Sequence, residues 1–522
     1  MSLNLTVLTS NPILRAPVEW QPLSANPIIG KDVLELLSTS MYINPLSIYR
    51  EYIQNAADAI DDARRSQVLS NAAVGRVDIS LDASARTVRI RDNGIGLNRG
   101  SFIERLIAFG ASKKRGSRAR GFRGVGRLAG LGYCQELVFR SKSLEDEQVS
   151  ELRWDCRQLK TLLRTPEFSD DLEKLVREIV ATRTLRSTGF PSHFFEVELA
   201  GIIRHGNDVL VDGGSIEGYL SQVAPVPFAP AFRWREQIDS ILSPSVGLGN
   251  LEIHIDGRAE PVYRPHRNEF EVRREVADSF KELEALTIRN SDGDAAAVGW
   301  VLHHGYWGSI PSGSRVSGLR LRTGNMQIGE PNLLDDLFPE ARFNSWVVGE
   351  IHIIDARVLP NGRRDHFEQN IHFRNIVSQL SPIARELVRR CRVSSLKRNC
   401  MRQFEQGMAS VTDRVAILRQ GATTKTRRRE LIEEVQGHVP KLEKISSSAL
   451  LDPDVQRNYG IRLKRLDSQL CKLLNANGSH KNLMRLRVKQ RRLVQRVFDL
   501  IYANSGNQGS AKILVDKILR HL

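Results

Sequence analysis

The sequence predicts a mixed α/β protein in three parts: an α/β part over residues 1–200, a second α/β part over 201–372, and an all-helical part over 373–522. In the first part, the helix-compatible stretch REYIQNAADAI precedes TVRIRD, which alternates as a strand does. The first part is also expected to hold a helix over roughly residues 166–184. The second part holds strand patterns such as LEIHID and the glycine-punctuated SWVVGEIHIID, and the third has few glycines and long helical patterns. A chain of 522 residues accommodates about three to four domains.

The first motif is REYIQNAAD, which begins at Arg50. Glu51, Asn55 and Asp58 follow one another at intervals of four and three residues, which places them on one face of a helix. The amide oxygen of Asn55 is a suitable ligand for Mg²⁺, and Glu51 is suited to orient or deprotonate an attacking water. For these residues alone, the alternative of an ordinary solvated polar stripe stays open.

The second motif is DNGIG, which follows the predicted strand. Asp92 ends the strand and Asn93-Gly94 turns the chain. One interpretation is a plain hairpin turn. The other is a buried carboxylate that accepts the exocyclic amine of adenine, with Gly94 and Gly96 allowing the base to approach the backbone.

The third motif is the glycine run GFRGVGRLAGLG, from Gly121 to Gly132. Such a run leaves backbone N–H groups open to an anion, so it suits phosphate binding. From Gly124 it also matches the dinucleotide fingerprint GxGxxA. That fingerprint requires a preceding strand, whereas the basic loop ASKKRGSRAR stands here. The three motifs together indicate an ATP site.

In this order, Glu-x-x-x-Asn-x-x-Asp, Asp-x-Gly-x-Gly and a glycine-rich lid, the motifs resemble the GHKL ATPases, the group of gyrase, heat-shock chaperones, histidine kinases and MutL. REYIQNAADAI is most similar to the ninety-kilodalton heat-shock chaperones, and FGASKK followed by GFRGVGRLAGL lies between the chaperone lid and the MutL lid. The resemblance implies a Bergerat-type α/β sandwich that binds ATP and Mg²⁺ under a mobile lid.

The resemblance also implies roles for single residues. Glu51 becomes the general base, Asn55 the Mg²⁺ ligand and Asp92 the reader of adenine. The remaining expected ATP contacts are Asp58, Gly94 and Gly96, the lid residues Ser112 and Lys113, the phosphate loop Gly121, Phe122, Arg123, Gly124, Val125 and Gly126, and Thr188, which matches the threonine that helps the aspartate hold adenine.

The second part resembles the transducer domain of these proteins. Its segment LPNGRRDHFEQN resembles the catalytic loop of the heat-shock chaperones, in which an asparagine precedes an arginine and an acid by three residues. Asn361, Arg364 and Asp365 take those places, so Arg364 is expected to reach the γ-phosphate. Arg363 stays open as the alternative, and so does an ordinary exposed basic turn.

The third part carries the excess positive charge. Residues 373–522 hold 31 lysines and arginines against 12 aspartates and glutamates, a net charge of +19 in a chain of +16, so the rest carries −3. Two interpretations stay open: non-specific nucleic-acid binding through phosphates, and a dimerisation bundle with a solvated basic exterior. Rare aromatic residues argue against base stacking. The helical pattern near the end predicts a buried stripe of Leu483, Leu486, Val494, Val497 and Ile501.

Composition and the absence of other motifs exclude several classes of protein. The chain lacks a run of about eighteen apolar residues and a secretory signal, so we expect neither a membrane span nor secretion. Five scattered cysteines without a CxxC pair favour a reducing, cytoplasmic location over a disulfide framework or zinc site. The P-loop, HExxH and GxSxG motifs are absent from the sequence.

The sequence-based hypothesis is an ATP-hydrolysing conformational machine, homodimeric and heat-shock-chaperone-like, that remodels protein clients. Two alternatives stay open. One is a nucleic-acid-associated clamp resembling MutL or MORC proteins, in genome maintenance or defence. The other is a nucleotide-regulated scaffold with little turnover.

Overall fold

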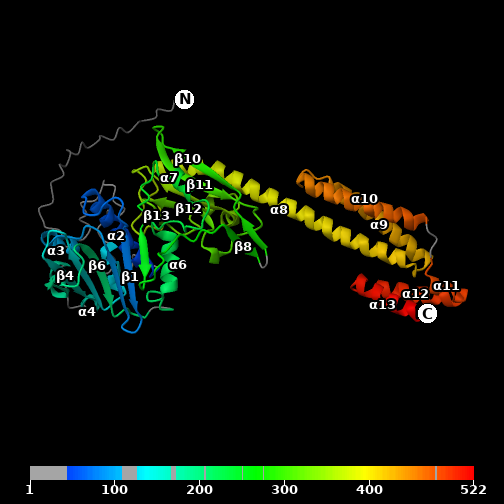
Figure 1. Ribbon diagram of the computed structural model, residues 1–522, viewed down its shortest axis with the longest axis horizontal. Coiled ribbons are helices and arrows are strands. Elements are labelled where there is room, and N and C mark those ends of the chain that lie inside the picture. The colour runs from blue at the N-terminus through cyan, green and yellow to red at the C-terminus, as the bar shows by residue number, and fades with distance from the viewer. Residues whose placement is uncertain are drawn as a thin grey trace, which may run out of the picture. The chain divides into compact units, whose positions relative to one another are not determined.

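The computed structural model describes Leu34 and residues 44–108, 126–165, 172–204, 207–249, 251–273, 276–475 and 479–522 (Figure 1). The chain divides into two compact units. The first consists of Met1–Leu220 and Asn250–Val262, and the second of Ser221–Gly249 and Tyr263–Leu522.

The first unit is built on a seven-stranded sheet in the order β5-β4-β3-β6-β2-β1-β7. Neighbouring strands are antiparallel except β1 and β7, which are parallel. The strands are β1 Arg76–Asp82, β2 Thr87–Asp92, β3 Glu136–Lys142, β4 Gln148–Asp155, β5 Val180–Arg186, β6 Phe194–Ala200 and β7 Glu252–Ile255. The helices are α2 Ser47–Arg65, α3 Arg99–Ile107, the 3₁₀-helix η2 Gly126–Gly132, α4 Cys156–Arg164 and α5 Leu172–Ile179. Helix α6, Gly213–Val223, begins in this unit and ends in the second.

Two details of this unit differ from the sequence-based expectation. Residues 166–184 were expected to form one helix, but α5 ends at Ile179 and the chain continues as β5. Alternate β-branched residues in VATRTLR favour a strand, and the edge of β4 supplies its partner. The strand expected in LEIHID is present as β7, but it completes the first sheet by pairing with β1.

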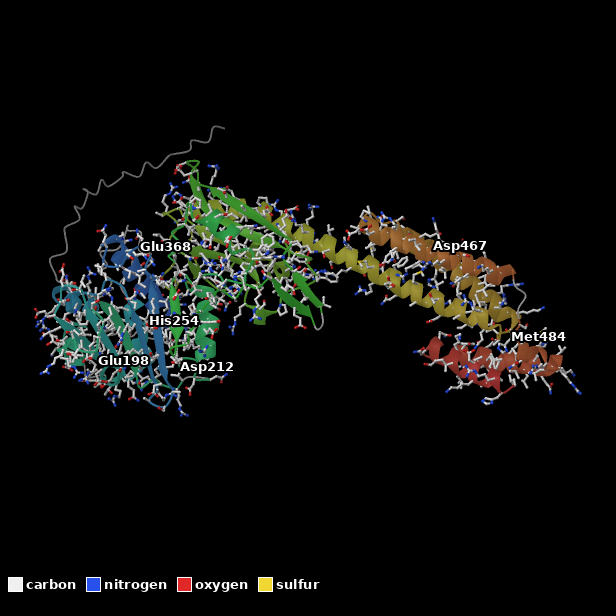
Figure 2. The ribbon with its side chains drawn as sticks, in the orientation of Figure 1. Glu198, Asp212, His254, Glu368, Asp467 and Met484 are labelled. Atoms are coloured by element: carbon white, nitrogen blue, oxygen red, sulfur yellow. The ribbon has the colours of Figure 1, made fainter. Side chains whose placement is uncertain are left out.

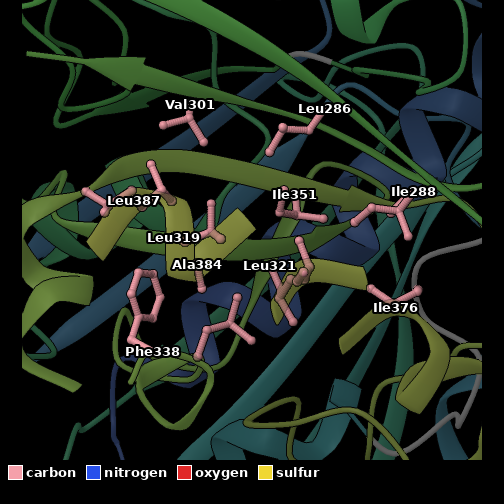
Figure 3. Packing of buried hydrophobic residues seen from close by; sticks show 14 of the residues in the cluster. Leu286, Ile288, Val301, Leu319, Leu321, Phe338, Ile351, Ile376, Ala384 and Leu387 are labelled. Carbon is pink, nitrogen blue, oxygen red and sulfur yellow. The ribbon is translucent and has the colours of Figure 1, made fainter. Parts of the chain in front are cut away.

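The second unit contains a five-stranded sheet in the order β10-β11-β14-β12-β13 and a separate β8–β9 pair. Its two central strands, β11 and β14, are buried almost throughout. Val301 and Ile351 contribute to a core cluster on one side, which Figure 3 shows, and Trp300 contributes to a second cluster. The elements are α7 Arg235–Leu242, β8 Glu269–Arg273, β9 Val276–Ser279, β10 Glu282–Arg289, β11 Ala295–His303, η3 Ser312–Ser314, β12 Gly318–Thr323, β13 Met326–Ile328, η4 Asp335–Leu337, η5 Ala341–Trp346 and β14 Val348–Ile353.

The helical region follows as one continuous element and five further helices. Helix α8 runs for 50 residues from Ile371 to Gln420, and its first turns complete the core cluster of the second sheet. It begins where the Asn370 side chain accepts a hydrogen bond from the Phe373 N–H, and it ends at Gly421 in the left-handed conformation. The others are α9 Lys425–Ser446, α10 Pro453–Asn475, α11 Lys481–Met484, α12 Val488–Asn504 and α13 Gln508–Arg520. The predicted fold class, α/β followed by all-α, is confirmed.

One member of the predicted C-terminal stripe is misplaced. Leu483 is buried, and Leu486, Val494 and Ile501 pack against the same cluster, but the Val497 side chain is 46% exposed. Val494, Val497 and Ile501 lie on the same helix, α12, where the third and fourth residues after Val494 are alternative inward positions, and Phe498 takes that place.

Candidate active site

Helix α2 carries the first motif and brings its polar residues into the interior. Glu51 and Asp58 are buried, and Asn55 between them is half-buried. Arg50 Nε lies 3.8 Å from Glu51 Oε1. Because Glu51 and Asp58 are buried, the motif does not form an ordinary solvated stripe, and its carboxylates need compensating partners.

The second motif lies directly against α2. The N–H of Ile95 donates to the Ala59 carbonyl of α2 at 3.1 Å. A Cβ at Gly94 would lie 2.6 Å from the Ala59 Cβ, so only glycine permits this approach. At Gly96, φ is +71° and a Cβ would lie 2.1 Å from the Lys142 carbonyl oxygen. The chain leaves β2 toward α3 here, so Asn93-Gly94 is not a two-residue hairpin turn.

Asp92 is the buried carboxylate at the end of β2. One of its oxygens accepts a hydrogen bond from the Gly94 N–H at 2.8 Å. Burial raises the pKa of Asp92 to about 7, although the backbone N–H groups of Gly94 and Phe195 act in the opposite direction. In its ionised form, the Asp92 side chain can accept a further hydrogen bond from a ligand amine.

The described end of the third motif also meets α2. A Cβ at Gly126 would lie 2.2 Å from Glu51 Oε2, so the start of η2 rests on that carboxylate. The Gly130 N–H donates to the Tyr52 hydroxyl at 3.0 Å, and this hydroxyl lies 3.3 Å from the Arg127 carbonyl oxygen, to which it donates. Parts of all three motifs are therefore adjacent to one helix.

His193 is a residue of this site that the sequence reasoning missed. Its Nδ1 lies 2.7 Å from the Gly94 carbonyl oxygen, two residues beyond Asp92. The sheet register accounts for this contact, because Asp92 pairs with Phe195 and the antiparallel register then places His193 beside Gly94. Thr188 is exposed in the turn between β5 and β6, and its assignment to adenine stays a prediction.

The expected lid and phosphate-loop residues fall outside the described part of the chain. They are Ser112, Lys113, Gly121, Phe122, Arg123, Gly124 and Val125.

Arg364 lies in the second unit, in a tight turn. The Asn361 N–H donates to the His366 carbonyl at 2.9 Å, and the Gly329 N–H donates to the Arg364 carbonyl at 2.9 Å. Arg364 has φ +57° and is buried, whereas its neighbour Arg363 is exposed. The segment is an anchored turn, and both arginines stay candidates for the γ-phosphate contact.

The donor set fits Mg²⁺ bound through a nucleotide better than a cation held by protein ligands alone. Within the described ranges, no group of three or more histidine, cysteine, aspartate or glutamate residues forms a metal site. An amide oxygen beside buried carboxylates, as at Asn55, suits an ion that keeps several waters and takes phosphate oxygens.

Residues 46–175 match the family model of the histidine kinase-, DNA gyrase B-, and HSP90-like ATPases. This match and the arrangement of the three motifs define the first unit as a GHKL-type ATPase domain. The expected resemblance to this superfamily is confirmed.

The curated relatives place this domain near the HSP90-like branch. The chaperone protein HtpG of Coxiella burnetii is 42% identical over 95 residues, which are 17% of this chain and 14% of that protein. HtpG of Dechloromonas aromatica is 32% identical over 124 residues (22% and 19%), and HtpG of Salmonella paratyphi B is 29% identical over 210 residues (37% and 30%). The chain thus spans less than a third of the length of these relatives.

None of the described helices combines the length and the hydropathy that crossing a bilayer requires.

The buried Asp92 predicts a pH effect on stability. Because its pKa is raised in the folded state, the folded protein holds this proton more tightly than the unfolded chain. The contribution of Asp92 to the free energy of unfolding is therefore full below about pH 4 and is lost as the pH rises to about 7. The loss is at most about 4 kcal/mol, at 1.36 kcal/mol per pKa unit. Urea denaturation at pH 5 and pH 8 measures this, with Asp92→Asn as the control. An identical pH dependence in both proteins contradicts the assignment.

Proposed function

We propose that the protein is a Mg²⁺-dependent ATPase whose nucleotide cycle drives a conformational change. The observation that carries the proposal is the convergence on α2: Glu51, Asn55 and Asp58 lie on this helix, and the Asp92 loop and the Gly126 end of η2 both contact it. These residues combine a reader of adenine, a metal ligand, a water-activating carboxylate and a backbone approach for phosphates.

Each residue then has one task. Asp92 accepts the exocyclic amine of adenine, and the Gly94 backbone leaves room for the base. Asn55 would hold Mg²⁺, which would neutralise phosphate charge. The Glu51 carboxylate orients the attacking water and accepts its proton. Arg364 or Arg363 stabilises the charge that develops on the γ-phosphate.

The proposed output is chaperone-like action on protein clients by a homodimer in the cytoplasm. The support is the similarity of the ATPase domain to chaperone proteins named HtpG. A second candidate, a nucleic-acid-associated ATPase, is favoured by the net charge of +19 in residues 373–522. A nucleotide-regulated scaffold with little turnover is the third.

The test is ATP binding and turnover with Mg²⁺, for the wild type beside Asp92→Asn. We expect the variant to bind ATP about 10- to 100-fold more weakly, because a hydrogen bond to a charged acceptor is worth about 1.5–3 kcal/mol. Calorimetric titration measures the affinity, and phosphate release measures the turnover.

Added duplex DNA separates the candidate outputs. Stimulation of turnover favours the nucleic-acid-associated ATPase, and indifference favours protein clients. Specific ATP binding without turnover favours the nucleotide-regulated scaffold. A wild type that neither binds nor hydrolyses ATP contradicts the proposed function.

A further inference from the structure

The end of the helical region around α11 and α12 has an unusual charge distribution. Residues 468–498, between Asp467 and Asp499, contain no acidic residue and hold eight lysines and arginines. Figure 2 labels Asp467 on α10, just before this segment, and Met484 at the end of α11, within it. Seven of the eight cations are exposed: Lys472, Lys481, Arg485, Arg487, Lys489, Arg492 and Arg496.

Several other cations of the region are paired with carboxylates. Arg414 and Arg427 pair with Glu434, and Arg462 pairs with Glu405. Across the described residues, none of the eight cations in 468–498 makes such an ion pair; the side-chain contact of Arg491 is with the Met484 sulfur.

Of the acids that flank this segment, Asp467 is exposed on α10, whereas Asp499 and Asp516 are engaged in hydrogen bonds. Asp499 accepts a hydrogen bond from the Thr424 hydroxyl at 2.6 Å. Asp516 accepts from Gln420 at 2.7 Å and from Lys512 at 2.8 Å. These carboxylates fix α12 and α13 to the junction of α8 and α9, so they do not offset the exposed positive charge.

The orientation of α12 places cations on its outermost line. Phe498 is fully buried in the core of the helical region. Lys489 stands nine residues earlier, which at 100° per residue is the opposite side of the helix, and Arg496 lies close to the same line. Leu493 and Leu500 are exposed beside this line.

We propose that this basic surface, formed by the seven exposed cations, binds the phosphate backbone of duplex nucleic acid. Exposed positive charges that follow one another along several helices, without acidic residues between them, complement the negative charges of a phosphate backbone. Contacts with phosphates carry no base preference. The large side chains exposed on this segment are aliphatic, so stacking on single-stranded bases is disfavoured. Helix α12 directs Lys489 and Arg496 outward together with Leu493 and Leu500, so a lipid surface is the alternative that the vesicle measurement below tests.

The experiment is binding of a short fluorescent DNA duplex of arbitrary sequence to the full-length protein at several salt concentrations. We expect Lys489→Gln/Arg492→Gln/Arg496→Gln to lower the affinity at least about tenfold. The slope of log affinity against log salt should fall by about 2 to 3, because each phosphate contact contributes about 0.9.

The matched control removes the same charge from ion-paired cations of the same region. Arg389, Arg427 and Arg457 pair with Glu386, Glu430 and Asp454 on their own helices. Arg389→Gln/Arg427→Gln/Arg457→Gln should leave duplex affinity within about twofold of the wild type. An unchanged circular dichroism spectrum verifies that both variants are folded.

Three outcomes overturn the inference: no duplex binding at low salt, an equal loss in both triple variants, or binding to phosphatidylserine vesicles without binding to the duplex. Loss of duplex binding on Leu493→Gln/Leu500→Gln also contradicts it, because it makes the apolar band the contact. The inference rests on the second candidate of the proposed function and assigns its nucleic-acid contact to this surface. ATP binding by the triple variant should be unchanged, which keeps a failure of the surface distinguishable from a failure of the ATP site.

Discussion

Replacing Glu51 by alanine is expected to reduce ATP turnover about 100- to 10,000-fold while ATP binding stays within a few-fold of the wild type. General base catalysis contributes this range, and the carboxylate acts on water rather than on the adenine or ribose. Glu51 is buried on α2 and contacts the start of η2 at Gly126. Single-turnover phosphate release measures the chemical step, and equilibrium titration measures the binding.

Two further variants make this result interpretable. Glu51→Gln keeps the shape beside Gly126 and should be equally slow, which excludes a packing effect. Asp62→Ala removes an exposed acid from the same helix and should turn over ATP normally. Turnover of Glu51→Ala above about one tenth of the wild-type rate means that another group activates the water.

Replacing Glu350 by alanine is expected to have the largest effect on stability, about 3–5 kcal/mol. Glu350 is buried at the centre of the second sheet, where Oε1 accepts from Arg322 Nε at 2.7 Å and Oε2 accepts from Arg264. Burial alone would raise the pKa of Glu350, but the two guanidinium groups hold it well below its usual range. Without the carboxylate, both arginines remain buried and uncompensated. Urea denaturation with hydrogen exchange of the β12 and β14 amides measures the loss.

The control for Glu350 is a glutamate paired with arginines at the surface. Glu340 pairs with Arg342 and Arg392, and Glu340→Ala should change the midpoint of urea denaturation little, because water screens the pair. The ionised Glu350 stabilises the protein above the unfolded carboxyl pKa, and this contribution is lost as the pH falls through its lower folded value. Equal effects of the two alanine variants contradict the assigned importance of the buried cluster.

Local patterns predicted much of the fold and the centre of the site. The spacing of Glu51, Asn55 and Asp58 determines their shared face as soon as α2 forms. Gly94 and Gly96 were predicted to let a base approach the backbone, which stays a prediction. What the structure shows is that both glycines are needed for packing against Ala59 and Lys142.

Contacts that depend on the register between strands could not be predicted from the sequence. His193 lies beside Gly94 because β6 pairs with β2 in one register, and a shift of a single residue would turn its side chain to the other face. The partner of β7 was equally hidden, since a short alternating strand such as LEIHID fits either sheet. Val497 was misassigned because helical periodicity allows either the third or the fourth residue after Val494 to face the core, and the fourth, Phe498, does.

The pairing of β7 with β1 has a consequence for synthesis of the chain. The sheet of the ATPase domain gains its last strand only after residues 221–249, which belong to the other unit, have been made. Until then, the backbone groups of Arg76–Ile79 form an open strand edge, the kind of surface at which chains pair with one another and aggregate. We therefore expect a fragment that ends at residue 200 or 220 to aggregate, and the smallest self-sufficient ATPase domain to be discontinuous in sequence, with 250–262 supplied as its closing segment.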